Sequence, residues 1–146
     1  MTISIKTFNE LTTRELYELL QLRSEVFVVE QNCVYQDVDD KDQKAIHVLG
    51  KKDNKIVAYT RAFKPGDYFD NPAIGRVVVK TSERKYGFGR VIMKATIDYI
   101  ENTLKGAQIE LSAQTYLIKF YNSLGFFEQG KEYLEDDIPH IKMIKP

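Results

Sequence analysis

The sequence is poor in the residues that mark several large protein classes. Its one cysteine, Cys33, cannot form an internal disulfide, which fits a reducing compartment. It has two histidines, and they form no Cys/His cluster of the kind that binds metal. Lys+Arg and Asp+Glu both number 21, so the formal net charge is zero. That balance argues against a general nucleic-acid binder. We therefore expect no metal site and no nucleic-acid partner.

Long apolar runs are also missing. No run approaches the length of a membrane span, and residues 1–6 lack the basic and apolar regions of a signal peptide. The sequence thus predicts a cytoplasmic protein with no membrane partner. Its 146 residues, 43% hydrophobic and 29% charged, fit one soluble domain over 1–146 with its own core.

Hydrophobic periodicity predicts ten elements in the order β-α-β-β-β-α-β-α-β-β. The first helix begins at a capping box, in which Thr12 is the cap and Glu15 reaches back to it. The apolar strand at 73–80 leads into a glycine turn, and the helix after this turn stops near Gly106. A strand at 108–113 then completes a parallel crossover. We expect a mixed α/β fold with a central sheet.

The glycine turn is the most informative segment, because it combines flexible backbone, basic side chains and a helix start. Free amide groups at a helix N-terminus, with the helix dipole and nearby arginines, favour a bound anion such as a pyrophosphate. A Walker loop would need Lys and then Ser or Thr after Gly89, where Arg90 and Val91 stand. A dinucleotide fingerprint would need a third glycine at Ile92, although Glu110 lies near the right distance for a ribose-binding acid. A plain solvated turn is the simplest alternative.

A third phosphate-loop pattern is matched in full. Arg84-Lys85-Tyr86-Gly87-Phe88-Gly89 is Arg-x-x-Gly-x-Gly and resembles the pyrophosphate loop of the Gcn5-related N-acetyltransferase (GNAT) superfamily. The segment 114–126, a polar residue, a helix with Tyr121 near its end and then Gly-Phe, is similar to the second coenzyme A motif of that family. The resemblance implies the GNAT fold, an α/β fold with a mixed central sheet of about seven strands and flanking helices. It places the cofactor cleft between the strands at 73–80 and 108–113, and the cofactor would be acetyl-CoA (coenzyme A).

A narrower resemblance, to the ElaA-like branch of the family, covers nearly the whole chain. It rests on 23–31, on Tyr35, Asp39, Asp42 and His47, and on the segments 60–61, 74–77 and 135–140. The branch commonly has Gly where this chain has Asp137, which leaves the form of that turn open.

The resemblance also assigns roles. The residues that it implies for the cofactor are Val77, Val78, Val79, Arg84, Lys85, Gly87, Phe88, Gly89, Arg90, Gln114 and Tyr121. Backbone amides of 77–79 would bind the pantetheine arm and polarise the acetyl carbonyl. The Tyr121 phenol would donate a proton to the departing thiolate, although its spacing also fits a plain core residue.

The general base is less clear, because the strand at 73–80 carries no carboxylate. We take Glu30 as the catalytic candidate, with His47, Glu135, His140 or a water chain as alternatives. Substrate contacts are expected from Gln31, His47, Arg61, Arg76 and His140. Arg61 and Arg76 would bind an anionic substrate group, or pair with the acidic run at 37–42. That run is typical of a solvated face, or of a lip that attracts a cationic amine.

The resemblance thus implies an acetyl-CoA-dependent N-acetyltransferase that acts on a primary amine of a small molecule or peptide. Attack would be direct, in a ternary complex, because Cys33 lies far along the chain from both motifs. A homodimer is compatible with this interpretation. The alternative from another class is a non-catalytic acyl-CoA-binding or sensing domain.

Overall fold

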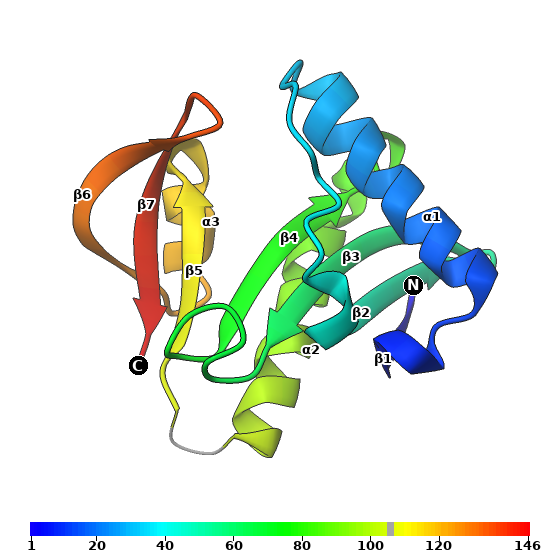
Figure 1. Ribbon diagram of the computed structural model, residues 1–146, viewed down its shortest axis with the longest axis horizontal. Helices are drawn as coiled ribbons and strands as arrows, with labels where there is room; N and C mark the ends of the chain where they lie inside the picture. The colour runs from blue at the N-terminus through cyan, green and yellow to red at the C-terminus, as the bar shows by residue number, and fades with distance from the viewer. Residues whose placement is uncertain (105–106) are drawn as a thin grey trace.

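The computed structural model describes residues 1–104 and 107–146 and contains a seven-stranded sheet of order β1-β2-β3-β4-β5-β7-β6 (Figure 1). The strands are β1 (Thr2–Thr7), β2 (Ile46–Lys52), β3 (Lys55–Phe63), β4 (Ala73–Val79), β5 (Ile109–Gln114), β6 (Phe127–Glu135) and β7 (Ile138–Lys145). Neighbours pair antiparallel except β4 and β5, which are parallel. The predicted mixed sheet is confirmed.

Three α-helices flank the sheet, and α1 lies on the opposite face from α2 and α3 (Figure 1). They are α1 (Thr13–Arg23), α2 (Phe88–Thr103) and α3 (Ile118–Asn122). A π-helical turn, η2 (Ser24–Glu30), extends α1, and short 3₁₀ turns are η1 (Phe8–Glu10), η3 (Asp42–Lys44), η4 (Thr81–Tyr86) and η5 (Thr115–Leu117). The predicted element order is confirmed. Among the described residues, no helix is both long and apolar enough to cross a membrane.

The two long helices are built as their sequences predict. Helix α1 starts at the capping box of Thr12 and Glu15, with both reciprocal hydrogen bonds present. It buries Leu19 and Leu22 in a cluster with Tyr59 of β3. Each such side chain contributes about 1.5–3 kcal/mol when fully buried. Helix α2 packs a second apolar face under the sheet. The predicted helix stop at Gly106 lies outside the described residues.

The two parallel strands, β4 and β5, diverge. They pair at Ala73 and Glu110, where the Glu110 amide also donates to the Pro72 carbonyl at 2.9 Å. Beyond that point the described residues of the two strands share no further pairs. Strands β6 and β7 continue the sheet from β5, so the sheet is split into two parts that open away from each other (Figure 1). The split creates the space in which the candidate site lies.

The predicted turn at 135–137 joins β6 to β7, and its backbone shows why the ElaA-like branch commonly has Gly where this chain has Asp137. Asp136 and Asp137 have φ values of 50° and 61°, the left-handed region that two-residue hairpin turns require. Glycine takes this conformation without a Cβ penalty. The position that holds Asp137 therefore favours Gly for backbone reasons.

Replacing Asp137 by Gly is expected to stabilise the protein by about 1 kcal/mol, because the left-handed conformation is costly for a residue with a Cβ. Urea denaturation would measure the change. Asp70→Gly is the control, since Asp70 is an exposed loop residue whose φ is not positive. An Asp137→Gly midpoint at or below that of the wild type would contradict this account of the turn.

Candidate active site

A cleft of about 620 Å³ opens between β4 and β5. That volume is typical of a ligand-binding site. Both motifs of the sequence reach it, together with the segments that follow α1, β3 and β6. The predicted site residues that line it are Glu30, Gln31, Arg61, Arg76, Val77, Val78, Val79, Arg84, Gly87, Gly89, Arg90, Gln114, Tyr121 and His140. One cleft thus brings together residues that are more than 100 positions apart.

The glycine turn provides an anion cradle at one end of this cleft. Gly87 has φ +72° and precedes the first residue of α2, whose first-turn amides have no partner within the helix. A Cβ built on Gly89 would lie 3.6 Å from Phe120 and 3.8 Å from Val79, and both of these residues line the cleft. A methyl group at Gly89 would be in ordinary van der Waals contact with both residues, and a larger side chain would extend into the cradle. The shape and the positive end of α2 fit a diphosphate.

Two residues assigned to the cofactor lie elsewhere. Lys85 is exposed and its Nζ is 5.3 Å from the ring centre of Tyr86, while Phe88 packs against a buried cluster that includes Ile92. Neither lines the cleft. The side chain of Phe88 is used for packing and that of Lys85 is exposed, so a role for either residue in cofactor binding stays a prediction that rests on the backbone of the turn.

Strand β4 carries a bulge at the cleft. Its pairing with β3 shifts between Tyr59 and Arg61, which leaves Arg76 and Val77 outside the ladder. Arg76 has φ 49°, an uncommon value for a residue with a side chain. Strained backbone of this kind is concentrated at functional sites. The bulge leaves backbone amides beside the cleft, where they could bind a carbonyl.

Tyr121 is both a packed residue and a cleft residue. Its ring meets Phe120 and Phe126 at centroid distances of 5.2 Å and 6.1 Å, and it also lines the cleft. Burial raises the pKa of the Tyr121 phenol, so the group keeps its proton throughout the physiological range. A neutral phenol at this place can act as a proton donor.

Two predicted residues meet across the cleft. Gln114, at the end of β5, and Gln31, just after the π-helical turn, exchange hydrogen bonds of 3.3 Å and 3.5 Å between their side-chain amides. They connect the segment after α1 to the far wall of the split sheet. A pantetheine arm would pass close to this pair if it follows β4.

Glu30 lines the cleft but is already engaged. Arg84 donates to it from Nη1 at 2.6 Å and from Nη2 at 3.1 Å, and Thr81 also donates to it. These hydrogen bonds, those from Arg84 first, lower the pKa of the Glu30 carboxyl. A carboxylate held in this way is a weak proton acceptor, so the geometry disfavours Glu30 as the general base.

The structure corrects the prediction that His47 contacts the substrate, because it does not bring this residue to the cleft. Its side chain is fully buried, its Nε2 donates to the Asp42 carbonyl at 2.9 Å and its Nδ1 accepts from the Tyr59 hydroxyl at 2.6 Å. Burial lowers the pKa of His47, so the imidazole stays neutral. Both ring nitrogens of His47 are bonded to buried groups, so neither can bind a substrate.

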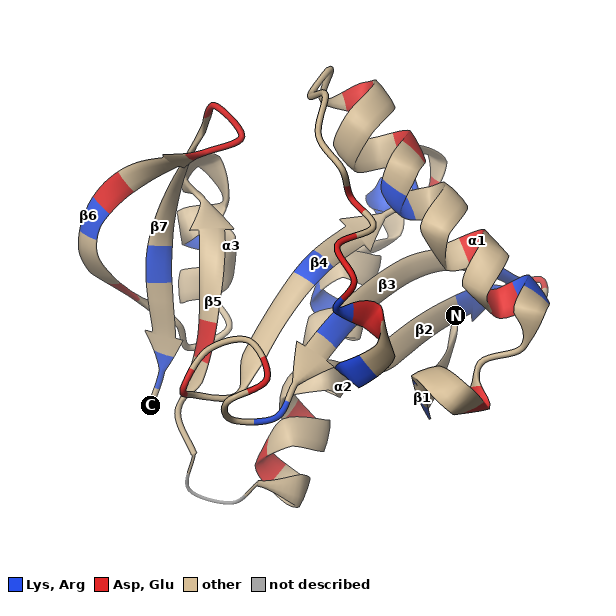
Figure 2. Cartoon of the chain, in the orientation of Figure 1, with Lys and Arg blue, Asp and Glu red and all other residues tan. Residues whose placement is uncertain are grey.

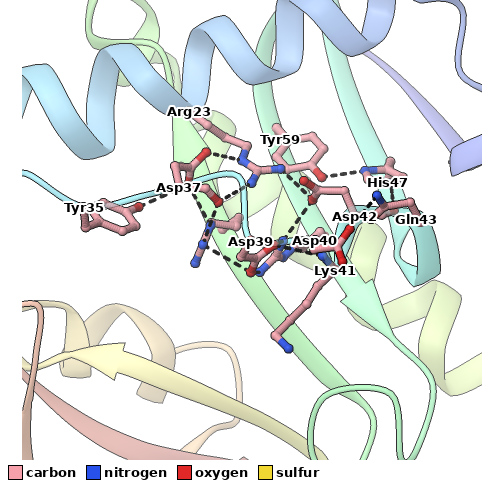
Figure 3. Close-up of polar contacts among 12 residues, drawn as sticks. Arg23, Tyr35, Asp37, Asp39, Asp40, Lys41, Asp42, Gln43, His47 and Tyr59 are labelled. Atoms are coloured by element: carbon pink, nitrogen blue, oxygen red, sulfur yellow. Dashed lines mark hydrogen bonds and ion pairs between the residues drawn. The ribbon is translucent and has the colours of Figure 1, made fainter.

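The acidic run is a solvated face only in part, because Asp40 is exposed while the other three aspartates face arginines. Asp37 and Asp42 are buried, and with Asp39 they pair with three arginines. Figure 2 shows the acidic run along the chain, and Figure 3 shows its aspartates beside Arg23. We call this group the arginine–aspartate cluster; its members are Arg23, Arg61, Arg76, Asp37, Asp39 and Asp42. The alternative that Arg61 and Arg76 pair with the acidic run is confirmed. Polar composition alone gave no sign that the run turns inward.

The cluster ties α1 to the wall of the cleft. Arg23, fully buried, contacts Asp37 at 2.8 Å and Asp42 at 2.7 Å. Asp37 in turn lies 2.8 Å from Nε of Arg76 on the bulge of β4. The charge of Arg76 is thus offset by aspartates, which weakens the case for an anionic group on the substrate.

Several cleft residues were missed by sequence reasoning. Tyr35 and the aromatic side chains of Phe63, Tyr68 and Phe69 line the end of the cleft beside the arginine–aspartate cluster. The pair Tyr68-Phe69, in a loop bounded by prolines, was the available signal. Cys33 also lines the cleft, although it was placed far from the motifs on sequence distance alone. Within the described residues, no group of three His, Cys, Asp or Glu side chains could hold a metal ion.

Known proteins resemble this chain in sequence and in architecture. Protein ElaA of Escherichia coli strain K12 is 42% identical over 139 residues, which cover 94% of this chain and 91% of ElaA. The crystal structure of E. coli ElaA matches with a TM-score of 0.93 at 39% identity, over 99% of each chain. An acyl-CoA N-acyltransferase from Pseudomonas aeruginosa matches with a TM-score of 0.94 at 39% identity, over the whole of both chains.

A more distant structure shares the fold. An aminoglycoside 6'-N-acetyltransferase complexed with coenzyme A matches with a TM-score of 0.73 at 19% identity, over 99% of this chain and 96% of that one. The family described as "Acetyltransferase (GNAT) domain" matches residues 10–146. With the split sheet, the glycine cradle and these relatives together, the chain belongs to the GNAT acetyltransferase family, in its ElaA-like branch.

Proposed function

We propose that this protein is an acetyl-CoA-dependent N-acetyltransferase that transfers the acetyl group to a primary amine of a small molecule or peptide. The observation that carries the proposal is that the glycine cradle and the Tyr121 phenol line one cleft in the split of the sheet. An anion site at one end and a proton donor farther in match the diphosphate and the thioester of an acyl-coenzyme A.

The chain offers a contact for each part of the cofactor. The first-turn amides of α2, with Arg84 and Arg90 at the cleft, would hold the diphosphate. The arm would run along β4, and a backbone amide at the bulge of Arg76 and Val77 would polarise the thioester carbonyl. Tyr121 would supply a proton to the leaving sulfur.

The non-catalytic alternative rests on one feature, the lack of a carboxylate in β4. A binding domain would need the cradle but would have no need of a phenol beside the sulfur. The position of Tyr121 in the cleft therefore favours the enzyme.

The test is thiol release from acetyl-CoA with a panel of amines that includes monoamines, diamines, amino acid esters and short peptides. We expect thiol release that depends on one amine class, with the acetylated product seen by mass spectrometry. Coenzyme A binding without release for any amine would favour the binding domain. Equal release with and without amine would indicate hydrolysis instead.

Gly89→Val should abolish the thermal protection that coenzyme A gives. A ligand bound only to the folded protein stabilises it by mass action, about 2.7 kcal/mol at 100 times its Kd. The branched side chain would occupy the cradle, since the first carbon already meets Phe120 and Val79. Gly89→Ala is the matched control for loss of glycine. Normal coenzyme A protection of a folded Gly89→Val protein would rule out the cradle.

If the amine attacks the thioester directly, catalysis should not need the thiol of Cys33. Cys33 lines the cleft and its Sγ lies 3.5 Å from the Asp136 carbonyl, so its place alone does not exclude an acyl-enzyme. Cys33→Ser should keep kcat within about threefold of the wild type if the amine attacks the thioester directly. A loss of turnover, with an acetylated Cys33 detected in the wild type, would instead indicate a covalent route.

A further inference from the structure

The proposed reaction leaves one proton unassigned. A primary amine is largely a cation at neutral pH and must lose a proton before its nitrogen can attack a carbonyl carbon. Strand β4 has no carboxylate that could accept it. The nearby titratable residues that the sequence offers are Glu30, His47, Glu135 and His140.

Three of these are disfavoured by their surroundings. Glu30 is held by Arg84 and Thr81, and His47 is fully buried with both nitrogens bonded. The side chain of Glu135 is 50% exposed at the rim, whereas that of His140 is 7% exposed. His140, which lines the cleft, remains.

One hydrogen bond, made by Nδ1, fixes the tautomer of His140. Its Nδ1 lies 2.7 Å from the Ile138 carbonyl oxygen, which can only accept, so Nδ1 carries a hydrogen. In the neutral ring Nε2 is then an acceptor, and it lies 3.4 Å from Oε2 of Glu135. On this geometry, and resting on the proposed function, we infer that Nε2 of His140 is the general base that deprotonates the acceptor amine.

The sheet register places this base opposite the acid. His140 pairs with Gln114 on β5 and with Tyr133 on β6, and paired residues point to the same face. Ile141, the next residue, packs into the core that also contains Tyr121 of α3. Because side chains alternate along a strand, His140 faces away from α3. Acid and base thus approach the cleft from opposite faces of the sheet, which leaves the space between them for the thioester and the amine.

Two side chains, Tyr133 and Glu135, lie against the ring of His140. The ring stacks on Tyr133 at a centroid distance of 6.2 Å, and Glu135 is placed to bond Nε2 once it is protonated. The other titratable groups on this face or at this rim are Cys33, Glu110, Asp136 and Lys142. Glu110 lies 3.9 Å from Lys142, whereas Glu135 lies 3.4 Å from Nε2 of His140.

The step balances as follows. His140 Nε2 takes one proton from the ammonium group, and the neutral nitrogen attacks the thioester carbonyl carbon. The C–N bond forms and the C–S bond breaks, and the sulfur leaves with the bonding electrons and takes the Tyr121 proton. The nitrogen then loses its second proton, which restores Tyr121, and His140 releases its proton to water. The net products are an amide, a free thiol and one proton.

Nuclear magnetic resonance tests the tautomer without any acceptor. The chain has two histidines, and the structure gives them opposite forms, Nε2–H for His47 and Nδ1–H for His140. The long-range ¹H–¹⁵N correlation spectrum of the wild type should show one histidine in each form. The spectrum of His140→Asn should show only the Nε2–H form. An Nε2–H form for His140 would overturn the inference.

Kinetics tests the role, with each amine of the panel that the wild type acetylates. His140→Asn keeps a donor near the Ile138 carbonyl but has no basic nitrogen. We expect kcat/KM at neutral pH to fall by about 10²-fold or more, with coenzyme A protection unchanged. The deficit should shrink as the pH rises past the pKa of the amine, because free amine is then present in solution. A merely structural role would give the same deficit at every pH.

The controls separate the possible failures. Tyr133→Phe removes a neighbouring hydroxyl and keeps the stacked ring, so its rates should stay near those of the wild type. Glu135→Gln should lower the rate less than His140→Asn and in the same pH range. If the wild type acetylates no amine, the proposed function fails. If the wild type is active and His140→Asn matches it, or loses activity equally at all pH values, only the assignment of the base fails.

Discussion

Tyr121→Phe should lower kcat by about 10²-fold or more while coenzyme A still binds. The substitution keeps the ring between Phe120 and Phe126 and removes only the hydroxyl. Because burial raises the pKa of the phenol, the hydroxyl is protonated when the thiolate departs. Without it, the sulfur would have to leave as an unprotonated anion in a partly closed cleft.

The measurement is kcat with the acceptor found in the amine panel, beside thermal protection by coenzyme A. Tyr99→Phe is the matched control, because Tyr99 is a partly buried tyrosine of α2 that does not line the cleft. If Tyr121→Phe turned over as fast as Tyr99→Phe, Tyr121 would be a core residue only.

Arg23→Met should destabilise the fold by about 3–5 kcal/mol, the usual cost of removing one partner from a buried ion pair. Arg23 is fully buried and satisfies both Asp37 and Asp42, so the variant leaves two buried carboxylates short of a partner. Urea denaturation measures the loss. Arg14→Met, in the same helix, is the control, since Arg14 is 79% exposed and pairs with the surface residue Glu18 one turn away. A loss for Arg23→Met as small as that for Arg14→Met would show that the cluster adds little stability.

The arginine–aspartate cluster also predicts how stability depends on pH. Burial opposes ionisation of Asp39, but Arg61 and Arg76 outweigh it and lower the pKa of Asp39 from 3.8 to about 2. A carboxyl whose pKa is lower in the folded state stabilises the protein above its unfolded pKa. That contribution should disappear as the pH falls from about 4 to about 2, and Asp39→Asn should flatten the decline.

The fold was largely predictable because its signals are local. Three features depend only on residues that are close in the sequence: the capping box of Thr12 and Glu15, the apolar run of Val77 to Val79, and the glycine turn before α2. The same holds for the turn at Asp136 and Asp137. Together with the family resemblance, they predicted a cleft between the strands where the structure has one, β4 and β5.

The parts that were wrong or missed depend on distant partners. The acidic run looks solvated until Arg23, Arg61 and Arg76 are brought to it by three different elements. The two histidines look alike in sequence, yet one is enclosed by Tyr59 and Asp42 and the other faces the cleft. No local pattern distinguishes them, because both are buried and the sheet register sets which neighbours each one meets.

A crystal structure of this protein with coenzyme A tests the central claim most directly. We predict that the diphosphate binds the amides at 87–90, that the arm lies between β4 and β5, and that the sulfur lies within hydrogen-bonding distance of the Tyr121 hydroxyl. His140 should then face the sulfur from the other side of the sheet. Coenzyme A bound outside this cleft, or bound in it with its sulfur turned away from Tyr121, would contradict the account.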